Sequence, residues 1–223
     1  MTPNQQNPLP SNFPPEHELS IDVAACWGFL ERVKTLAAKE TLHAGHKAAA
    51  ARLAVRHGHS DILRVLLPYL PSYQNWANVA LMTAASYGHA DCVRLLVDVA
   101  DPRAVRDGQT ALEAAAQYGH TQCARILLPY AEPKRLNSLA LQSAALRNDQ
   151  EMIDLMYTVS DVDAAIDALK RHPENTEAWQ RLAARKAVDT NHNQQVLRDT
   201  VNAVVAQIKK RRANSADNFV PSS

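Results

Sequence analysis

The stretch LEAAAQYGHTQCARILLPY, residues 112–130, has a helical apolar pattern that is interrupted by a Gly-His pair. Two similar stretches precede it, LMTAASYGHADCVRLLVD at residues 81–98 and ARLAVRHGHSDILRVLLPY at residues 51–69. One pattern that recurs at a regular spacing indicates a stack of repeats, each forming one small structural unit. We therefore expect the fold to be built from this unit rather than around a single central core.

The turn at the centre of each unit gives the period. A chain that reverses between two antiparallel helices needs a residue with positive φ, which glycine adopts without steric penalty and asparagine adopts more readily than most residues. Alanines before the turn let neighbouring helices approach closely, and leucine pairs after it fill the layer between units. Five turn positions, spaced 30, 30, 31 and 29 residues apart, follow this pattern: Gly28, Gly58, Gly88, Gly119 and Asn148.

These units resemble the ankyrin repeat, most clearly in DGQTALEAAAQYGHTQCARILL at residues 107–128. The resemblance implies an all-α fold, an ankyrin-type helix-pair solenoid with a C-terminal helical cap. The units are shorter than the family's usual period of about 33 residues, so we expect trimmed β-hairpin fingers except at residues 101–110. A tetratricopeptide array is the alternative, but its pattern occurs only once, at residues 172–183.

The two ends of the chain differ from the repeats. Five of the twelve prolines fall within the first fifteen residues, which favours a disordered segment there. Beyond the repeats the helical pattern changes, and solenoid ends need a cap that covers the last apolar face. The expected organisation is a disordered N-terminal tail at residues 1–17, ankyrin-like repeats at 18–160, a C-terminal helical cap at 161–212 and a disordered tail at 213–223.

The C-terminal region is expected to contain three helices. The first begins after Ser160 as its N-cap, the second covers about residues 176–188, and the third covers about residues 194–212. Four apolar residues of the third helix are spaced by 4, 3 and 4 residues and therefore share one face. This face can cover the fifth repeat, bind a partner or form a homodimer, and it comprises Leu197, Val201, Val204 and Ile208.

The composition narrows the classes of function. A formal net charge of +1 argues against nucleic acid as a partner. The basic cluster at residues 209–212 suits a helix C-terminus or a nuclear-import signal. No apolar run is long enough to span a membrane, and an odd set of three distant cysteines fits a reducing compartment. We expect a cytoplasmic protein, or one secreted into a host cell without a cleaved signal peptide.

The sequence shows no pattern typical of a catalytic site. Glycine-rich nucleotide loops are absent, and His43 and His46 lack the further ligands that a metal site needs. Cys26 has no evident base, so we expect no enzymatic activity, no cofactor and no bound metal. The remaining cysteines are interpreted as core residues, and the histidines after the turn glycines as hydrogen-bonding groups between adjacent loops: Cys92, Cys123, His59, His89 and His120.

If the resemblance holds, the residues just before each turn and the finger side of each first helix face a partner protein. This row contains Trp, Tyr and Arg, which are enriched at interface hot spots. The expected function is a non-enzymatic protein–protein interaction module that binds a partner through the concave face of the ankyrin-repeat stack, with a bacterial effector or adaptor acting on a host protein as the expected role. The alternative is an immunity or inhibitor protein, or a self-associating structural protein that uses the C-terminal helix. The candidate partner-binding residues are Trp76, Asn78, Tyr87, Ser86, Arg106, Gln109, Gln117, Tyr118, Arg56, His57 and Arg147.

Overall fold

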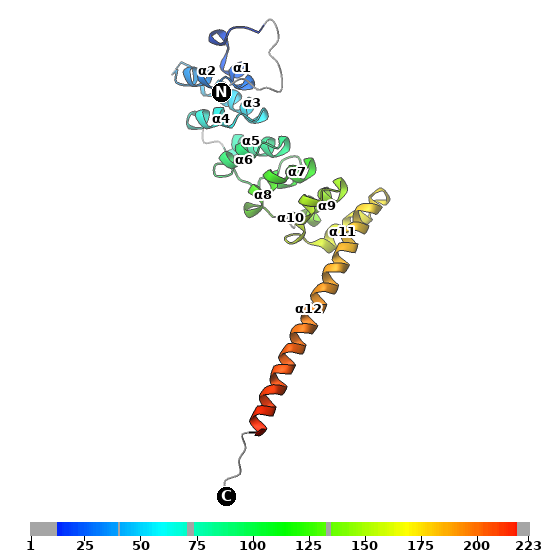
Figure 1. The fold of residues 1–223 in the computed structure, drawn as a ribbon. Helices are drawn as coiled ribbons and strands as arrows, with labels where there is room; N and C mark the ends of the chain where they lie inside the picture. The colour runs from blue at the N-terminus through cyan, green and yellow to red at the C-terminus, as the bar shows by residue number, and fades with distance from the viewer. Residues whose placement is uncertain (1–12, 40, 71–73, 133–134, 218–223) are drawn as a thin grey trace.

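The computed structural model describes residues 13–39, 41–70, 74–132 and 135–217. Its helices form pairs that stack one on another into a solenoid (Figure 1). The first repeats contain η1 (Glu16–Glu18), α1 (Ile21–Trp27), α2 (Leu30–Ala37), α3 (Ala44–Arg56), α4 (Ser60–Leu66), η2 (Leu67–Tyr69), α5 (Gln74–Tyr87) and α6 (Ala90–Leu96). The later part contains α7 (Ala111–Tyr118), α8 (Thr121–Leu127), η3 (Leu128–Tyr130), α9 (Arg135–Arg147), α10 (Gln150–Tyr157), α11 (Val162–Lys170), η4 (Pro173–Asn175) and α12 (Thr176–Asp217).

The helices lie in two rows. The first helices of successive pairs, α1, α3, α5, α7, α9 and α11, each contact the next one along the row. The second helices, α2, α4, α6, α8 and α10, form the other row in the same way. Because each pair contacts mainly its neighbours, stability comes from the stacking of units. The expected all-α helix-pair solenoid is confirmed.

The turn between the two helices of each pair has the predicted backbone conformation. The φ angles are 85° at Gly28, 76° at Gly58, 78° at Gly88 and 76° at Gly119. Asn148, in the fifth position, has a φ of 55°. All five lie in the left-handed region, which other residues enter only at a steric cost. The glycines are therefore required by the reversal of the chain.

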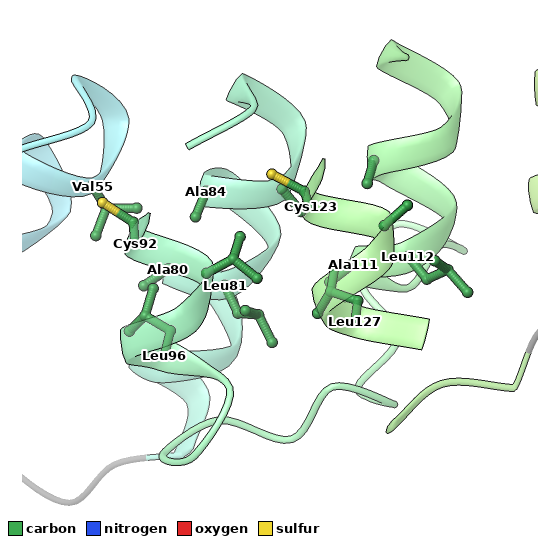
Figure 2. Close-up of a cluster of buried hydrophobic side chains, with 14 of the residues drawn as sticks. Val55, Ala80, Leu81, Ala84, Cys92, Leu96, Ala111, Leu112, Cys123 and Leu127 are labelled. Atoms are coloured by element: carbon green, nitrogen blue, oxygen red, sulfur yellow. The ribbon is translucent and has the colours of Figure 1, made fainter. Parts of the chain in front are cut away.

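The core is a continuous layer between the two rows of helices. The alanines on the first helices, such as Ala84 and Ala115, have no exposed surface, and neither do the leucines Leu96 and Leu127 on the second helices. Figure 2 shows these leucines and the neighbouring alanines among the packed helices. Burial of a leucine side chain stabilises the fold by about 1.5–3 kcal/mol. The alanines of the first helices therefore allow close approach of the helices, and the leucines of the second helices supply stability.

The two cysteines on the second helices belong to this layer. Cys92 and Cys123 are fully buried (Figure 2), which confirms their interpretation as core residues. Burial raises the pKa of the Cys92 thiol to about 12 and that of the Cys123 thiol to about 11. Both thiols are therefore protonated at neutral pH and act as small apolar groups.

One projecting finger is present at the expected place. Arg106 and Gln109 exchange two backbone hydrogen bonds, with N–O distances of 2.8 and 2.9 Å. Between them Asp107 and Gly108 have positive φ angles of 50° and 83°. Two consecutive residues with positive φ are typical of the tight turn of a two-residue hairpin. The prediction of a full finger at residues 101–110 is confirmed.

The C-terminal region differs in detail from the prediction. Helix α11 begins at Val162, with Asp161 as its N-cap, because the Asp161 carboxylate accepts a hydrogen bond from Ala164 N at 3.0 Å. The expected cap, Ser160, instead has its hydroxyl oxygen buried without a hydrogen-bond partner among the described residues. Helix α11 packs on α9 and continues the row of first helices into a sixth pair.

A single helix, α12, replaces the two helices that were expected at residues 176–188 and 194–212. The segment between them, VDTNHNQ at residues 188–194, contains polar residues of weak helix propensity but no glycine or proline to end a helix. Near its start, Trp179 and Leu182 pack against the core of the solenoid. Arg185 pairs with Asp154 of α10, and Lys186 pairs with Asp163 of α11. Beyond these contacts α12 projects away from the stack (Figure 1).

The expected tails lie partly outside the described residues. Residues 1–12 and 218–223 are not described, and neither are the side chains of residues 203–217, which include Val204, Ile208 and the basic cluster. Within the expected N-terminal tail, the Phe13 ring packs edge-on against Trp27, with centroids 5.2 Å apart. At the other end α12 continues to Asp217, five residues beyond the expected boundary at residue 212.

Candidate functional site

A ladder of histidines connects successive turns. The Nε2 atoms of His59, His89 and His120 lie 3.0 Å from the carbonyl oxygens of Cys26, Arg56 and Ser86 respectively, each in the preceding repeat. Because a carbonyl oxygen only accepts, Nε2 carries the proton and donates it in each case. The interpretation of these histidines as hydrogen-bonding groups between loops is confirmed.

The ladder fixes the backbone two residues before Gly28, Gly58 and Gly88, and the candidate tyrosine Tyr87 lies beside the last of these positions. Tyr87 is 50% exposed and Tyr118 is 51% exposed. The ring of Tyr87 stacks on His89 at a centroid distance of 6.2 Å, and the Arg56 guanidinium lies 5.9 Å from its centre. One side of Tyr87 is thus supported from within the chain. The Tyr87 ring is therefore held by a residue of its own turn and by one of the preceding repeat.

Other candidate residues lie beside this row. Gln109 on the finger donates from Nε2 to Oε1 of Gln117 on α7, at 2.7 Å, so the structure brings these two together. The Ser86 hydroxyl donates to the Met82 carbonyl oxygen at 2.8 Å. Arg106 at the finger tip forms a 3.5 Å ion pair with the adjacent Asp107.

Two candidate residues use their polar groups inside the solenoid. Trp76 packs partly buried against the core, and its Nε1 donates to the Ala48 carbonyl oxygen at 3.3 Å. The Asn78 side-chain oxygen accepts a hydrogen bond from Asp101 N at 2.7 Å. Both contacts join neighbouring repeats. These two side chains therefore use their polar groups to hold neighbouring parts of the solenoid together.

Arg147 occupies a position that differs from the earlier turns. The ladder ends at Asp149, which stands where a histidine follows Gly58, Gly88 and Gly119. A Cβ atom built on Gly119 would lie 2.8 Å from Nη2 of Arg147, so the guanidinium covers the turn that the histidine ring covers elsewhere. Arg147 itself is exposed, as expected for the row.

A groove runs across the first helices of the first three pairs. It has a volume of about 570 Å³. The sequence pattern indicated two of its residues, Arg56 and Tyr87, but not those one helical turn further from the glycines. Comparing equivalent positions of the repeats would have found Arg52, Leu53 and Thr83, which precede their turn glycines by five or six residues. The additional lining residues are Asp22, Ala49, Arg52, Leu53, Val55, Val79, Ala80 and Thr83.

Cys26 has a neighbouring base that was not expected. Its Sγ lies 3.4 Å from Nε2 of His57, one of the candidate residues. Burial raises the pKa of the Cys26 thiol and, together with Arg56 and His89, lowers the pKa of the His57 imidazole. Both shifts favour the neutral thiol and neutral imidazole, whereas a reactive cysteine needs the opposite shift toward thiolate. The pair is therefore a neutral hydrogen bond between adjacent repeats.

The two histidines that were considered as metal ligands, His43 and His46, lie at the start of a helix. His43 is the N-cap of α3, and its Nδ1 accepts a hydrogen bond from Gly45 N at 3.0 Å. The ring of His46 lies 6.5 Å from that of His43. In the described part of the chain, three or more metal-ligating side chains are nowhere grouped together. The described helices also include none that is long and apolar enough to cross a lipid bilayer.

Comparisons with known proteins agree with this architecture. A family model described as ankyrin repeats, in three copies, matches residues 21–105, 51–138 and 81–168. Among solved structures, the human ASB11 ankyrin repeat domain matches with a TM-score of 0.58 and 21% sequence identity, covering 75% of this chain and 83% of that one. At that identity the likeness shows the fold alone. No curated protein matches the chain.

Proposed function

The chain belongs to the ankyrin-repeat family, and because such repeats are generally protein–protein interaction modules, we propose that its concave face binds another protein. The observation that supports this face is the pair Tyr87 and Tyr118, half exposed at the same position of adjacent repeats. A rigid aromatic side chain offers a large contact area and loses little conformational entropy on binding. The fold is typically a non-enzymatic scaffold, and we infer the same here.

Replacing both tyrosines, Tyr87→Ala with Tyr118→Ala, should weaken partner binding while the helical fold is kept. Loss of a central aromatic anchor typically costs about 2 kcal/mol, or roughly 30-fold in affinity. The measurement is an affinity pull-down with the immobilised chain, followed by titration of the captured protein against wild type and variant. Circular dichroism of both forms checks that the fold is unchanged.

The chain offers a matched control for this test. Tyr69 and Tyr130 lie in the same pattern of repeats and are 42% and 44% exposed, but they end the second helices rather than the first. The variant Tyr69→Ala with Tyr130→Ala should therefore retain the partner. Equal loss from both double variants, or retention by both, would contradict binding at the concave face.

A more specific proposal concerns the kind of cell in which the partner protein is found. We propose a bacterial effector or adaptor that acts on a host protein, supported only by the alanine-rich composition. An immunity or inhibitor protein, which acts within its own cell, is the alternative. Parallel pull-downs from bacterial and eukaryotic lysates separate the two. A partner found only in the eukaryotic lysate supports the effector, and one found only in the bacterial lysate supports the alternative.

A second candidate function, self-association, is supported by the projecting helix. Leu197 is 66% exposed and Val201 is 53% exposed, one turn apart on α12. A helix that projects from a protein gains most of its stability from packing of its apolar face. A second copy of the chain could supply that packing.

The test of self-association is the mass in solution. Wild type should have twice the chain mass of 24.6 kDa by light scattering after size exclusion. Leu197→Glu with Val201→Glu should give the mass of a single chain, because charge on both apolar positions opposes helix pairing. Gln195→Glu with His192→Glu, on the opposite side of the same helix, should leave the dimer intact. A wild type that is already monomeric would exclude this candidate.

A further inference from the structure

Two arginines in the groove have no anionic partner within the described residues. Arg52 and Arg56 lie four residues apart on α3, so they share one face of the helix, and both are exposed. Arg56 lies beside the ring of Tyr87, and Arg52 makes no ion pair or hydrogen bond in the described structure. Some other arginines pair with carboxylates, such as Arg94 with Asp91 and Arg185 with Asp154. The two guanidinium groups of the groove therefore offer positive charge to a ligand.

The surface between and beside these arginines is apolar. Leu53 on α3 and Val79 and Ala80 on α5 line the same groove, with the Thr83 hydroxyl and the Tyr87 ring along one side. A volume of about 570 Å³ accommodates a few side chains of a peptide segment rather than a folded domain. The combination of an apolar floor with two guanidinium groups favours a ligand that carries both aliphatic and anionic groups.

Asp22 supplies the negative charge of the groove on the α1 side. Its Oδ1 is buried, and it has no hydrogen-bond partner among the described residues. A buried oxygen of this kind is stabilised when a ligand brings a donor to it. A peptide backbone has an N–H group at almost every residue and can bring one to Asp22 even when its side chains are acidic, whereas the phosphodiester backbone of a nucleic acid has no such donor.

We propose that this groove binds an acidic, extended segment of a partner protein. The proposal rests on the proposed function and names the chemistry of its ligand. Carboxylates of the segment pair with Arg52 and Arg56, an aliphatic side chain lies on Leu53 and Val79, and a backbone N–H faces Asp22. Side chains two positions apart in an extended segment lie about 6–7 Å from each other. That matches the spacing of about 6 Å between residues one turn apart on a helix.

The test begins with a library of random twelve-residue peptides displayed on phage. Selection on the wild-type chain should enrich sequences with two Asp or Glu residues at alternate positions beside an aliphatic residue. A synthetic peptide of the enriched sequence is then titrated by fluorescence anisotropy. Affinity for Arg52→Gln with Arg56→Gln should fall roughly 10- to 100-fold, since two charge-assisted contacts are lost. It should also fall with rising salt.

The control variant removes the same number of positive charges, but at residues that lie outside the groove. Arg64 and Arg94 occupy equivalent positions on the second helices α4 and α6 and do not line it. Arg64→Gln with Arg94→Gln should bind the peptide as wild type does. Circular dichroism and a thermal melt check that each variant is folded.

Three outcomes would overturn the proposal: selection without acidic enrichment, no selection at all, or equal affinity for the groove variant and wild type. The proposed function is tested separately with the protein partner from the pull-down. If that partner is lost with the tyrosine variant but kept by Arg52→Gln with Arg56→Gln, the concave face binds and the acidic ligand is wrong. Loss of the same partner with both variants, and not with the controls, supports both proposals.

Discussion

Replacing Arg135 with alanine is expected to destabilise the chain by roughly 3 kcal/mol. The Glu113 side chain on α7 is only 4% exposed, and both of its carboxylate oxygens accept from Arg135 Nη1 on α9, at 2.8 and 2.7 Å. Arg135 is itself 22% exposed. Without the guanidinium, a carboxylate stays in the interior with no opposite charge, which is the costly case for a buried pair. Urea denaturation of wild type and variant, followed by circular dichroism, measures the difference.

The Glu113 carboxylate also has a local role, which explains why it is buried. Its Oε2 accepts from Thr110 N at 2.7 Å, while the Thr110 hydroxyl accepts from Glu113 N at 3.4 Å. This capping box begins α7 directly after the finger. Arg135 reaches the finger too, since both Nη atoms lie 3.4 Å from the Gly108 carbonyl oxygen. The ion pair therefore joins α9, α7 and the finger tip.

A double variant separates the charge from the packing. Arg135→Met with Glu113→Gln removes both charges and keeps the side-chain volumes, so it should cost less than Arg135→Ala alone. Arg135→Lys keeps the charge but not the planar guanidinium, and an intermediate loss is expected. A stability of Arg135→Ala within about 0.5 kcal/mol of wild type, the range of ordinary surface changes, would refute this account of Glu113.

The repeat architecture could be predicted because it depends on backbone requirements that single residues reveal. A positive φ at the turn favours glycine, asparagine or aspartate, so Gly28 and Asn148 mark the same structural position. The Asp107–Gly108 pair marks the finger for the same reason. In both cases the residue type reports a local conformation that no neighbouring repeat can change.

The details of the surface depend on contacts between repeats, which residue type alone does not reveal. Trp76 could be an exposed anchor or a partly buried one, and only the position of Ala48 in the preceding repeat decides between them. Cys26 and His57 are 31 residues apart in sequence and meet because the repeats stack. Arg52 and Asp22 likewise belong to one groove only after α1 and α3 are placed side by side.

The C-terminal helix shows a different limit of what can be predicted from the sequence. Two separate helices were expected on either side of residues 188–194, yet α12 continues through this segment because its residues, although weak helix formers, do not prevent the helical conformation. Propensity is a small preference for each residue, whereas glycine and proline impose a larger penalty. The first part of α12 is fixed by Arg185 and Lys186 against α10 and α11, and the helix then extends from that anchored segment.

Replacing Gly88 with alanine is expected to cost roughly 2–3 kcal/mol, compared with roughly 1 kcal/mol for Gly119→Ala. Both changes place a Cβ atom at a positive φ, 78° and 76° respectively. At Gly88 the new atom would also lie 2.6 Å from Nδ1 of His120, whose ring is held by its hydrogen bond to Ser86 O. At Gly119 it would meet the end of the Arg147 side chain, which can move at little cost. Urea denaturation of the two variants compares them directly.

The origin of this difference can be tested by removing the ring. In a His120→Ala background, Gly88→Ala should cost only the backbone contribution, roughly 1 kcal/mol, because nothing then opposes the added Cβ atom. If Gly88→Ala costs the same with and without the histidine, the ring does not restrict the turn. Equal costs at Gly88 and Gly119 in the native background would lead to the same conclusion. The turn glycines would then serve the backbone alone, rather than also making room for the histidine ladder that connects the repeats.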